Sequence, residues 1–362
     1  MLNTSDEIAR YLPHPRCSLM IRFGPAGIPL SCKGRTLKDG IEDVHNLGLN
    51  ALEVQLLRTN MSERPADADE VGKIPCEIES ELIIDILRLK GEKMEPVSDL
   101  DKPIKKGDTL IGLNCGVARS YPELKELGSM AKELDVKLSI HTPYYMDLIC
   151  NEDICYRSMD AIRWAAIIAG QLQAEIVTTH IGLYGDVTQR TALNRVKTRL
   201  GSLSKWITKN EMKVKIGVEN SGRQEVFGSV GEILSLSRSM KNIVPVINFA
   251  RIHARESGSL REPSDFEKLI NSVQSVMKGA PVYSHFSGVE HETGNEKRLT
   301  PIKKGDLRFE PLAECILDNE YDICVISSSP LLEHDAMYMK VILERLLAKR
   351  MAKEVKVVKK GG

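Results

Sequence analysis

The chain has 362 residues, of which 50 are basic and 50 are acidic, so its formal net charge is zero. A protein without a basic excess does not attract nucleic acid through its overall field, and any such contact needs a local patch. The length is sufficient for one large α/β domain with an insertion.

The cysteines and the apolar runs indicate a cellular compartment. The eight cysteines are scattered without a Cys-x-x-Cys pair, which favours a reducing environment over a disulfide framework or a zinc finger. The polar start, Met1-Leu-Asn-Thr-Ser-Asp-Glu7, lacks a signal-peptide core, and no apolar run reaches the length of about 18 residues that a membrane span needs. These features predict a cytoplasmic protein without membrane contact, and they do not indicate its oligomeric state.

Strand and helix patterns alternate along nearly the whole chain. The first strand is predicted at residues 17–23 and the second at 50–57, and Thr36 and Asp39 resemble a capping box that starts the helix between them. Further on, helices are predicted over 122–134, 154–172, 188–207, 229–240, 263–277, 309–317 and 332–347, and strands are predicted to end at His141, His180, Glu219, Asn248, His285 and Ser327. Eight strands alternating with eight helices predict an α/β fold, a closed (β/α)8 TIM barrel spanning 1–362. An open doubly wound sheet is the alternative, although no glycine-rich phosphate loop follows the first strand.

One segment interrupts the alternation. Residues 58–119 stand where a short connection after the second strand is expected, and they contain strand-like runs at 82–88 and 109–114. We interpret this segment as an inserted small β-rich subdomain on the catalytic face. It serves either packing or dimer contact, or it covers the substrate.

Five of the buried runs end on a polar residue: His141, His180, Glu219, Asn248 and His285. The carboxyl ends of parallel barrel strands meet at one mouth, where (β/α)8 enzymes build their active sites, so we expect these side chains to converge. His and Glu are good ligands for zinc or a similar divalent ion, whereas an Asn amide is a poor one.

Short motifs surround these strand ends. They are His141-Thr-Pro-Tyr144, His180-Ile-Gly182, Glu219-Asn-Ser-Gly222, Ile252-His-Ala-Arg255 and Ser284-His-Phe-Ser-Gly288. In this order they resemble motifs of the endonuclease IV family of abasic-site endonucleases (AP endonuclease family 2), within the xylose isomerase-like group of barrels. The resemblance covers most of the chain outside the insertion.

The resemblance implies a trinuclear metal cluster, usually zinc, that cleaves the phosphodiester bond 5′ to an abasic site in DNA. By position, His141, His180 and Glu219 match the ligands of the first metal. Glu219 also matches the ligand that bridges to the second metal, which makes it the candidate catalytic residue. His285 matches one ligand of the second metal, and Tyr144 matches an aromatic residue that family members place against DNA.

Several positions depart from the family pattern. Asn248 stands where the family has an Asp ligand, and Arg251 stands where it has a His ligand of the third metal. Lys297 and Leu299 replace the two ligands of an Asp-x-His motif, and Ser328 replaces a Glu. Other residues close to the Asp-x-His position could serve instead: Glu290, His291, Glu292 and Glu296.

These replacements remove carboxylates and add positive charge. Holding two or three dications with Glu219 as the one mapped carboxylate, beside Arg251 and Lys297, costs more than neutral imidazoles recover. One ion held by His141, His180 and Glu219 remains reasonable, because two His and one carboxylate form a common site with open positions. We therefore predict one divalent metal, zinc in the first instance and manganese or magnesium as alternatives. Arg251 and Lys297 are either phosphate-binding cations or solvated surface charges.

Three functions follow from these observations. The first is a metal-dependent phosphodiesterase, an endodeoxyribonuclease-type hydrolase that acts in repair on DNA with an abasic or damaged site. The second is a barrel without a metal cluster that binds DNA or nucleotides. The third is an isomerase or epimerase acting on a small sugar or sugar phosphate, which the neutral net charge favours over the first.

Overall fold

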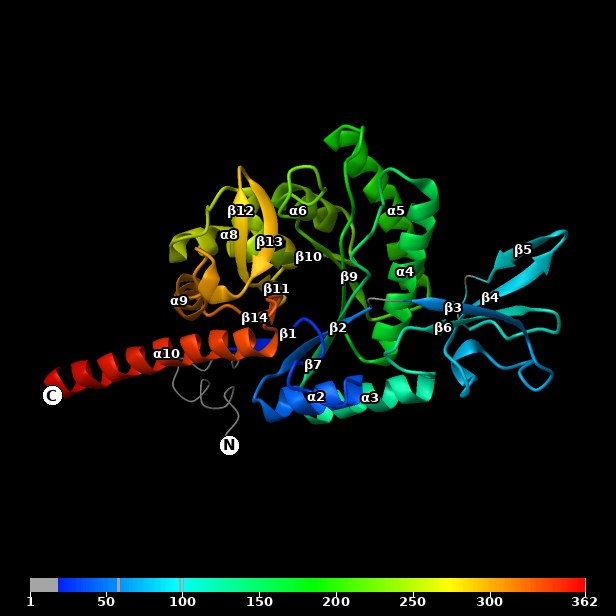
Figure 1. Cartoon of the computed structure of the whole chain (residues 1–362), viewed down its shortest axis with the longest axis horizontal. Coiled ribbons are helices and arrows are strands. Elements are labelled where there is room, and N and C mark those ends of the chain that lie inside the picture. Colours follow the sequence, from blue (N-terminus) through cyan, green and yellow to red (C-terminus); the bar gives the residue numbers. More distant parts are fainter. Residues whose placement is uncertain (1–18, 57–58, 98, 100, 362) are drawn as a thin grey trace.

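A computed structural model describes residues 19–56, 59–97, 99 and 101–361, with the backbone alone for 354–361. Eight parallel strands form one sheet, in the spatial order β1, β14, β11, β10, β9, β8, β7 and β2. Their bounds in chain order are β1 Ile21–Pro25, β2 Ala51–Gln55, β7 Lys137–His141, β8 Ile176–Thr179, β9 Lys215–Glu219, β10 Ile243–Asn248, β11 Val282–Phe286 and β14 Ile323–Ser327. The predicted (β/α)8 barrel is confirmed, and the chain of strands is nearly closed (Figure 1).

The barrel closes where β1 meets β2. Ala26 and Glu53 form an isolated parallel bridge, and the backbone N–H of Asn50 donates to the carbonyl of Phe23 at 3.0 Å. Gly24 makes this approach possible, because a Cβ atom there would lie 1.7 Å from the carbonyl oxygen of Ala51. Any other residue at this position would push the two strands apart.

Helices follow the strands as the pattern predicts. The bounds are α2 Leu37–Asn46, α3 Tyr121–Glu133, α4 Glu152–Gln171, α5 Gln189–Lys209, α6 Val230–Ser239, α8 Pro263–Met277, α9 Glu310–Asn319 and α10 Glu333–Gly361. The capping box predicted at Thr36 and Asp39 is present at the start of α2. In the predicted first strand, residues 17 and 18 lie outside the described part of the chain.

Two elements near the mouth were not predicted. A short helix, α7 (Phe249–Arg255), follows β10 directly, and the hairpin of β12 (Gly288–Glu292) and β13 (Asn295–Thr300) follows β11. A 3-10 turn, η2 (Ile302–Lys304), connects the hairpin to α9. Both α7 and the hairpin carry residues that bear on the candidate site.

Between β2 and α3, the chain forms a separate four-stranded antiparallel sheet in the order β3, β6, β4, β5. The strands are β3 Asn60–Pro65, β4 Ile83–Lys90, β5 Lys93–Pro96 and β6 Thr109–Asn114, and a 3-10 turn, η1, spans Pro75–Glu77. This sheet lies beside α3 and α4 rather than over the barrel mouth (Figure 1), so the expectation that it covers the mouth is wrong. The hydroxyl of Tyr121 on α3 donates to the carbonyl of Ile83 at 2.7 Å, and Arg163 on α4 pairs with Asp85.

The helices in the described part of the chain include none that combines the length and the apolar character needed to cross a membrane.

Candidate metal centre at the barrel mouth

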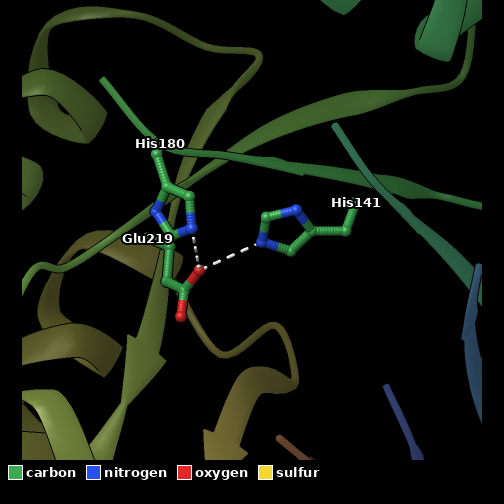
Figure 2. A group of neighbouring side chains, drawn as sticks. All are labelled: His141, His180 and Glu219. Atoms are coloured by element: carbon green, nitrogen blue, oxygen red, sulfur yellow. Dashed lines mark hydrogen bonds and ion pairs between the residues drawn. The ribbon is translucent and has the colours of Figure 1, made fainter. Parts of the chain in front are cut away.

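Three of the predicted ligands converge at the carboxyl ends of neighbouring strands (Figure 2). His141 ends β7, His180 follows β8 and Glu219 ends β9, and all three are buried. Oε2 of Glu219 lies 3.1 Å from Nε2 of His141 and 3.4 Å from Nε2 of His180. One ligand atom from each residue falls within 4.8 Å of the others, so the strand register alone brings the group together.

This spacing fits one divalent ion. Two ligand atoms on a tetrahedral zinc, each at about 2.0–2.2 Å, lie about 3.3–3.6 Å apart, close to the separations from Glu219 to the two histidines. Nδ1 of His141 donates to the backbone carbonyl of Thr142 at 2.7 Å, which directs the lone pair of a neutral ring at Nε2 toward Glu219. A neutral imidazole and a carboxylate oxygen would then face each other with lone pairs, and a cation between them removes the repulsion.

The protonation of His180 and Glu219 agrees with this arrangement. Burial lowers the pKa of His180 well below its ordinary value, against the opposing charge of Glu219, and the charge of Arg251 adds to the decrease. Burial would raise the pKa of Glu219, but the charges of Arg251 and His285 and the hydrogen bond with His141 hold it well below its usual range. An ionised carboxylate and a neutral imidazole are the forms that bind a metal. For His141, burial lowers the pKa, but the hydrogen bond to Glu219 and the charge of Glu53 raise it above its ordinary value, so a metal would have to displace a proton there.

The second oxygen of Glu219 is occupied by groups of the protein itself. Nδ2 of Asn248 donates to Oε1 at 2.8 Å, and Nη1 of Arg251 and Nδ1 of His285 lie 3.5 and 3.4 Å from it. Asn248 ends β10, and its side chain also caps α7 by accepting from the backbone N–H of Arg251 at 3.2 Å. The unpredicted helix α7 therefore aims Arg251 into the mouth.

Arg251 is buried among the candidate ligands and is not a solvated surface charge. Its Nη1 lies 3.2 and 3.3 Å from the two ring nitrogens of His180, so it points at neither lone pair. Its Nε lies 3.5 Å from Oε2 of Glu296 and has no hydrogen-bond partner among the described residues. Glu296, on β13, is one of the alternatives that the sequence left open, and here it faces the cation instead of joining the histidines.

His285 lies between two buried carboxylates. Its Nε2 is 2.9 Å from Oε2 of Glu53, on the opposite side of the ring from Glu219. Glu53 also accepts from the hydroxyl of Tyr283 at 3.0 Å and from Nε2 of Gln55 at 2.8 Å. Although burial lowers it, the charges of Glu53 and Glu219 raise the pKa of His285 to about 10. In the metal-free protein this pKa favours the imidazolium at neutral pH, so a second metal bound to His285 would first have to displace a proton.

Sequence reasoning missed Glu53. The residue lies in the middle of β2 and is 1% exposed. Its signal is a lone acidic residue inside the apolar run Ala51-Leu-Glu-Val54, since a carboxylate is almost never buried without a partner.

The structure separates Lys297 from the mouth. Consecutive side chains of a strand point to opposite faces, so Glu296 facing Arg251 sends Lys297 outward. Lys297 pairs with Glu292 on the adjacent strand and is exposed. The prediction that Lys297 contacts a phosphate at the mouth is therefore wrong, and its alternative, an exposed surface charge, holds. Leu299, at the other replaced position of the Asp-x-His motif, is partly buried and packs against the hydrophobic core.

The remaining two positions lie at the mouth. Ser328 follows β14, its backbone N–H donates to the carbonyl of Phe286 at 3.1 Å, and its hydroxyl is buried without a hydrogen-bond partner among the described residues. The ring of Tyr144 packs edge-on against His180 with centroids 5.0 Å apart, and the guanidinium of Arg251 lies 5.8 Å from the Tyr144 ring centroid. Tyr144 is half exposed and Tyr145 is 91% exposed, so this loop presents aromatic surface at the rim.

A second group of possible ligands joins α7 to the hairpin. Nε2 of His253 lies 3.2 Å from Oδ1 of Asp306, and Nε2 of His291 lies 3.6 Å from Oδ2. Nδ1 of His253 accepts from the backbone N–H of Leu260 at 3.2 Å, so the proton of the neutral ring is on Nε2. In this tautomer Nε2 carries a proton that faces Asp306, so it has no lone pair to offer a metal. We therefore interpret the group as a contact that holds the hairpin against α7.

Comparison with known proteins agrees with the barrel fold. Residues 111–333 match the family model described as xylose isomerase-like TIM barrel. An uncharacterized protein of Methanocaldococcus jannaschii is 27% identical over 271 residues, which cover 70% of this chain and 96% of that protein.

Two solved structures share the fold. Endonuclease IV from Thermus thermophilus superposes with a TM-score of 0.57 at 13% identity, covering 90% of this chain and 99% of that one. A D-tagatose 3-epimerase-like protein superposes with a TM-score of 0.51 at 21% identity, covering 64% of this chain and 85% of that one. Because the family model spans more than half of the chain, the protein belongs to the xylose isomerase-like TIM barrel family.

Proposed function

We propose that this protein is a metal-dependent phosphodiesterase that acts on DNA with an abasic or damaged site, with one divalent ion held by His141, His180 and Glu219. The observation that carries the proposal is the buried guanidinium of Arg251 immediately beside these ligands, within 3.5 Å of Glu219. A bound divalent ion supplies Lewis-acid polarisation of a phosphoryl oxygen and a more acidic water.

Residues beside the metal ligands would bind the substrate. Arg251 presents a planar fork of donors that matches phosphate oxygens. In the metal-free protein Arg251 faces the carboxylate of Glu219. A cation bound to Glu219 would neutralise part of that negative charge, and a substrate phosphate could then compete with Glu219 for the guanidinium. Tyr144 and Tyr145 offer the exposed aromatic surface on which an unpaired base or a sugar stacks.

A second candidate is epimerisation or isomerisation of a small sugar. Arg251 already faces two carboxylates, Glu219 and Glu296, and the formal net charge of the chain is zero. Both facts leave little positive charge for a DNA backbone, whose binding depends on neutralised phosphates. They favour a compact substrate that reaches the mouth without long-range attraction.

One experiment separates the candidates. The protein loaded with zinc, and separately with manganese, is incubated with a labelled duplex containing an abasic site and with a panel of ketohexoses. We expect strand cleavage, and we expect Glu219→Gln to abolish it. Arg251→Lys keeps the charge but loses the fork, so it should raise KM more than it lowers kcat.

Lys297→Gln is the matched control for the cation. Lys297 is exposed and paired with Glu292, so this variant should cleave the duplex as the wild type does. Sugar epimerisation without strand cleavage would reject the phosphodiesterase in favour of the second candidate. A protein that takes up no divalent ion and turns over neither substrate, yet binds the duplex, would instead be a binding barrel.

A further inference from the structure

A cavity lies at the opposite end of the barrel from the histidines. It has a volume of about 280 Å³ and opens among the first residues of the barrel strands, including Lys137 of β7, Lys215 of β9 and Val282 of β11. We call it the basal cavity. It is distinct from the mouth, because it is built from the amino-terminal ends of the strands whose carboxyl ends carry the candidate ligands.

The interior of the basal cavity is mainly apolar, with polar groups at two positions. Met20, Ile176, Met277 and Pro281 contribute accessible apolar surface. The hydroxyls of Ser139 and Tyr283, both buried, are hydrogen-bonded to each other. Such a lining of apolar surface with a few placed polar groups is typical of small-molecule sites, although the volume falls just below their range of about 300–1,000 Å³.

The rim of the basal cavity is positively charged. Arg22, Lys137 and Lys215 line it together with one acidic residue, Glu175, which pairs with Lys137. Lys215 forms no ion pair within the part of the chain that the structure describes. Arg22 pairs with Asp135, so the unpaired charge that favours an anion at the rim is that of Lys215.

Arg22 is fixed at the rim by its hydrogen bonds. Its Nη1 donates to the carbonyls of Asn50 and Asp135, each at 3.0 Å, and its Nη2 donates to Oδ1 of Asp135 at 2.8 Å. Its Nε is buried, has no hydrogen-bond partner among the described residues and presents almost no accessible surface to the cavity. Arg22 therefore contributes to the rim as a fixed guanidinium paired with Asp135.

We propose that the basal cavity binds a small organic carboxylate with a compact apolar body, such as an aromatic or branched aliphatic acid. The carboxylate meets Arg22 and Lys215 at the rim, and the apolar body enters among the aliphatic side chains. The small volume excludes long-chain acids, and the apolar interior disfavours inorganic phosphate. The inference does not depend on the chemistry at the mouth.

The test is titration calorimetry of the full chain with benzoate and with 4-methylpentanoate, each compared with its alcohol, benzyl alcohol or 4-methylpentan-1-ol. We expect at least one acid to bind, at least tenfold more tightly than its alcohol. Ala280→Phe places a ring in the cavity at a partly exposed position and should abolish binding. Lys215→Gln should weaken binding of the acid at least threefold and leave the alcohol unchanged.

Lys213→Gln is the matched control, because Lys213 is an exposed lysine just before the same strand and does not line the basal cavity. If Ala280→Phe fails to fold, the acid affinities of Lys215→Gln and Lys213→Gln still test the proposal, because only the first should be weakened. Failure of both acids to bind, or equal binding of acids and alcohols, would overturn the proposal. Binding that appears only after residues 1–18 are deleted would also overturn it, since the chain's own start would then be the occupant.

Discussion

Replacing Glu53 by Gln should destabilise the metal-free protein by about 3–5 kcal/mol, the cost of removing one partner from a buried ion pair. Glu53 is 1% exposed and His285 is 1% exposed, with Nε2 and Oε2 2.9 Å apart. Gln preserves the volume, so no cavity adds to the effect, and its one oxygen can still accept from Tyr283 and face His285. Its amide nitrogen then faces Nε2 of Gln55, so that hydrogen bond is lost unless the Gln55 amide turns over. The larger part of the effect is the loss of one negative charge beside the imidazolium.

The pKa of His285 gives an upper limit on the free energy by which its two carboxylate partners stabilise the folded state. Its rise from 6.5 to about 10 corresponds to about 5 kcal/mol, part of which belongs to Glu219. Because the folded pKa is the higher one, this stabilisation is complete below pH 6.5 and is lost as the pH rises through 10. The free energy of unfolding of the wild type should therefore decrease between these values, and Glu53→Gln should make that decrease smaller.

The assay is urea denaturation in excess chelator at several pH values between about 6 and 10, the window in which His285 changes its contribution. Glu95→Gln is the control, because Glu95 pairs with Lys90 at 3.1 Å on an exposed hairpin and should contribute at most about 1 kcal/mol. If Glu53→Gln costs no more than Glu95→Gln at neutral pH, His285 is not held as an imidazolium between two carboxylates, and the account of the mouth given above is wrong.

Three further predictions concern the metal and the inserted sheet. His141→Ala and Glu219→Ala should each abolish tight binding of one zinc ion, measured by competition with a chromogenic chelator. His291→Ala should leave that binding unchanged, and loss of the ion in this variant would move the site to the hairpin. Ile84→Ala truncates a fully buried side chain that joins the inserted sheet to the main core, so it should lower the free energy of unfolding by about 2–5 kcal/mol in urea. An unchanged unfolding midpoint would show that the sheet is dispensable to the barrel.

The barrel was predictable because its signals are local. Each buried run carries its own periodicity, and helix starts such as Thr36 and Asp39 are marked by short-range hydrogen bonds. The inserted sheet was predicted only in part, since β3 and β5 are short, exposed and lack apolar alternation. Its position could not follow from sequence either, because it depends on contacts such as Tyr121 with Ile83, which are remote in the chain.

The site was predictable only to the extent that strand ends determine it. His141, His180 and Glu219 are brought together by parallel register, which a sequence pattern indicates. Arg251 and Lys297 looked alike as added cations, yet one enters the mouth on α7 and the other faces away on β13. That difference depends on an unpredicted helix and on strand alternation. Glu53 was missed because a partner 232 residues away justifies its burial.

The two oxygens of Glu219 explain why one ion, and not three, suits this mouth. Oε2 faces His141 and His180 and has room for a cation between them, whereas Oε1 is surrounded by Asn248, Arg251 and His285. A bridging carboxylate needs both oxygens free, and here the second one already receives an amide and two positive charges. A second dication would have to displace Arg251 from its buried position, or it would have to remove the proton of His285 that Glu53 stabilises. Either step costs free energy and so weakens the binding of a second ion. Asn248 and Arg251, at two positions where the resemblance implies metal ligands, therefore surround Oε1 with an amide and a positive charge. We expect this mouth to combine one metal with a fixed guanidinium.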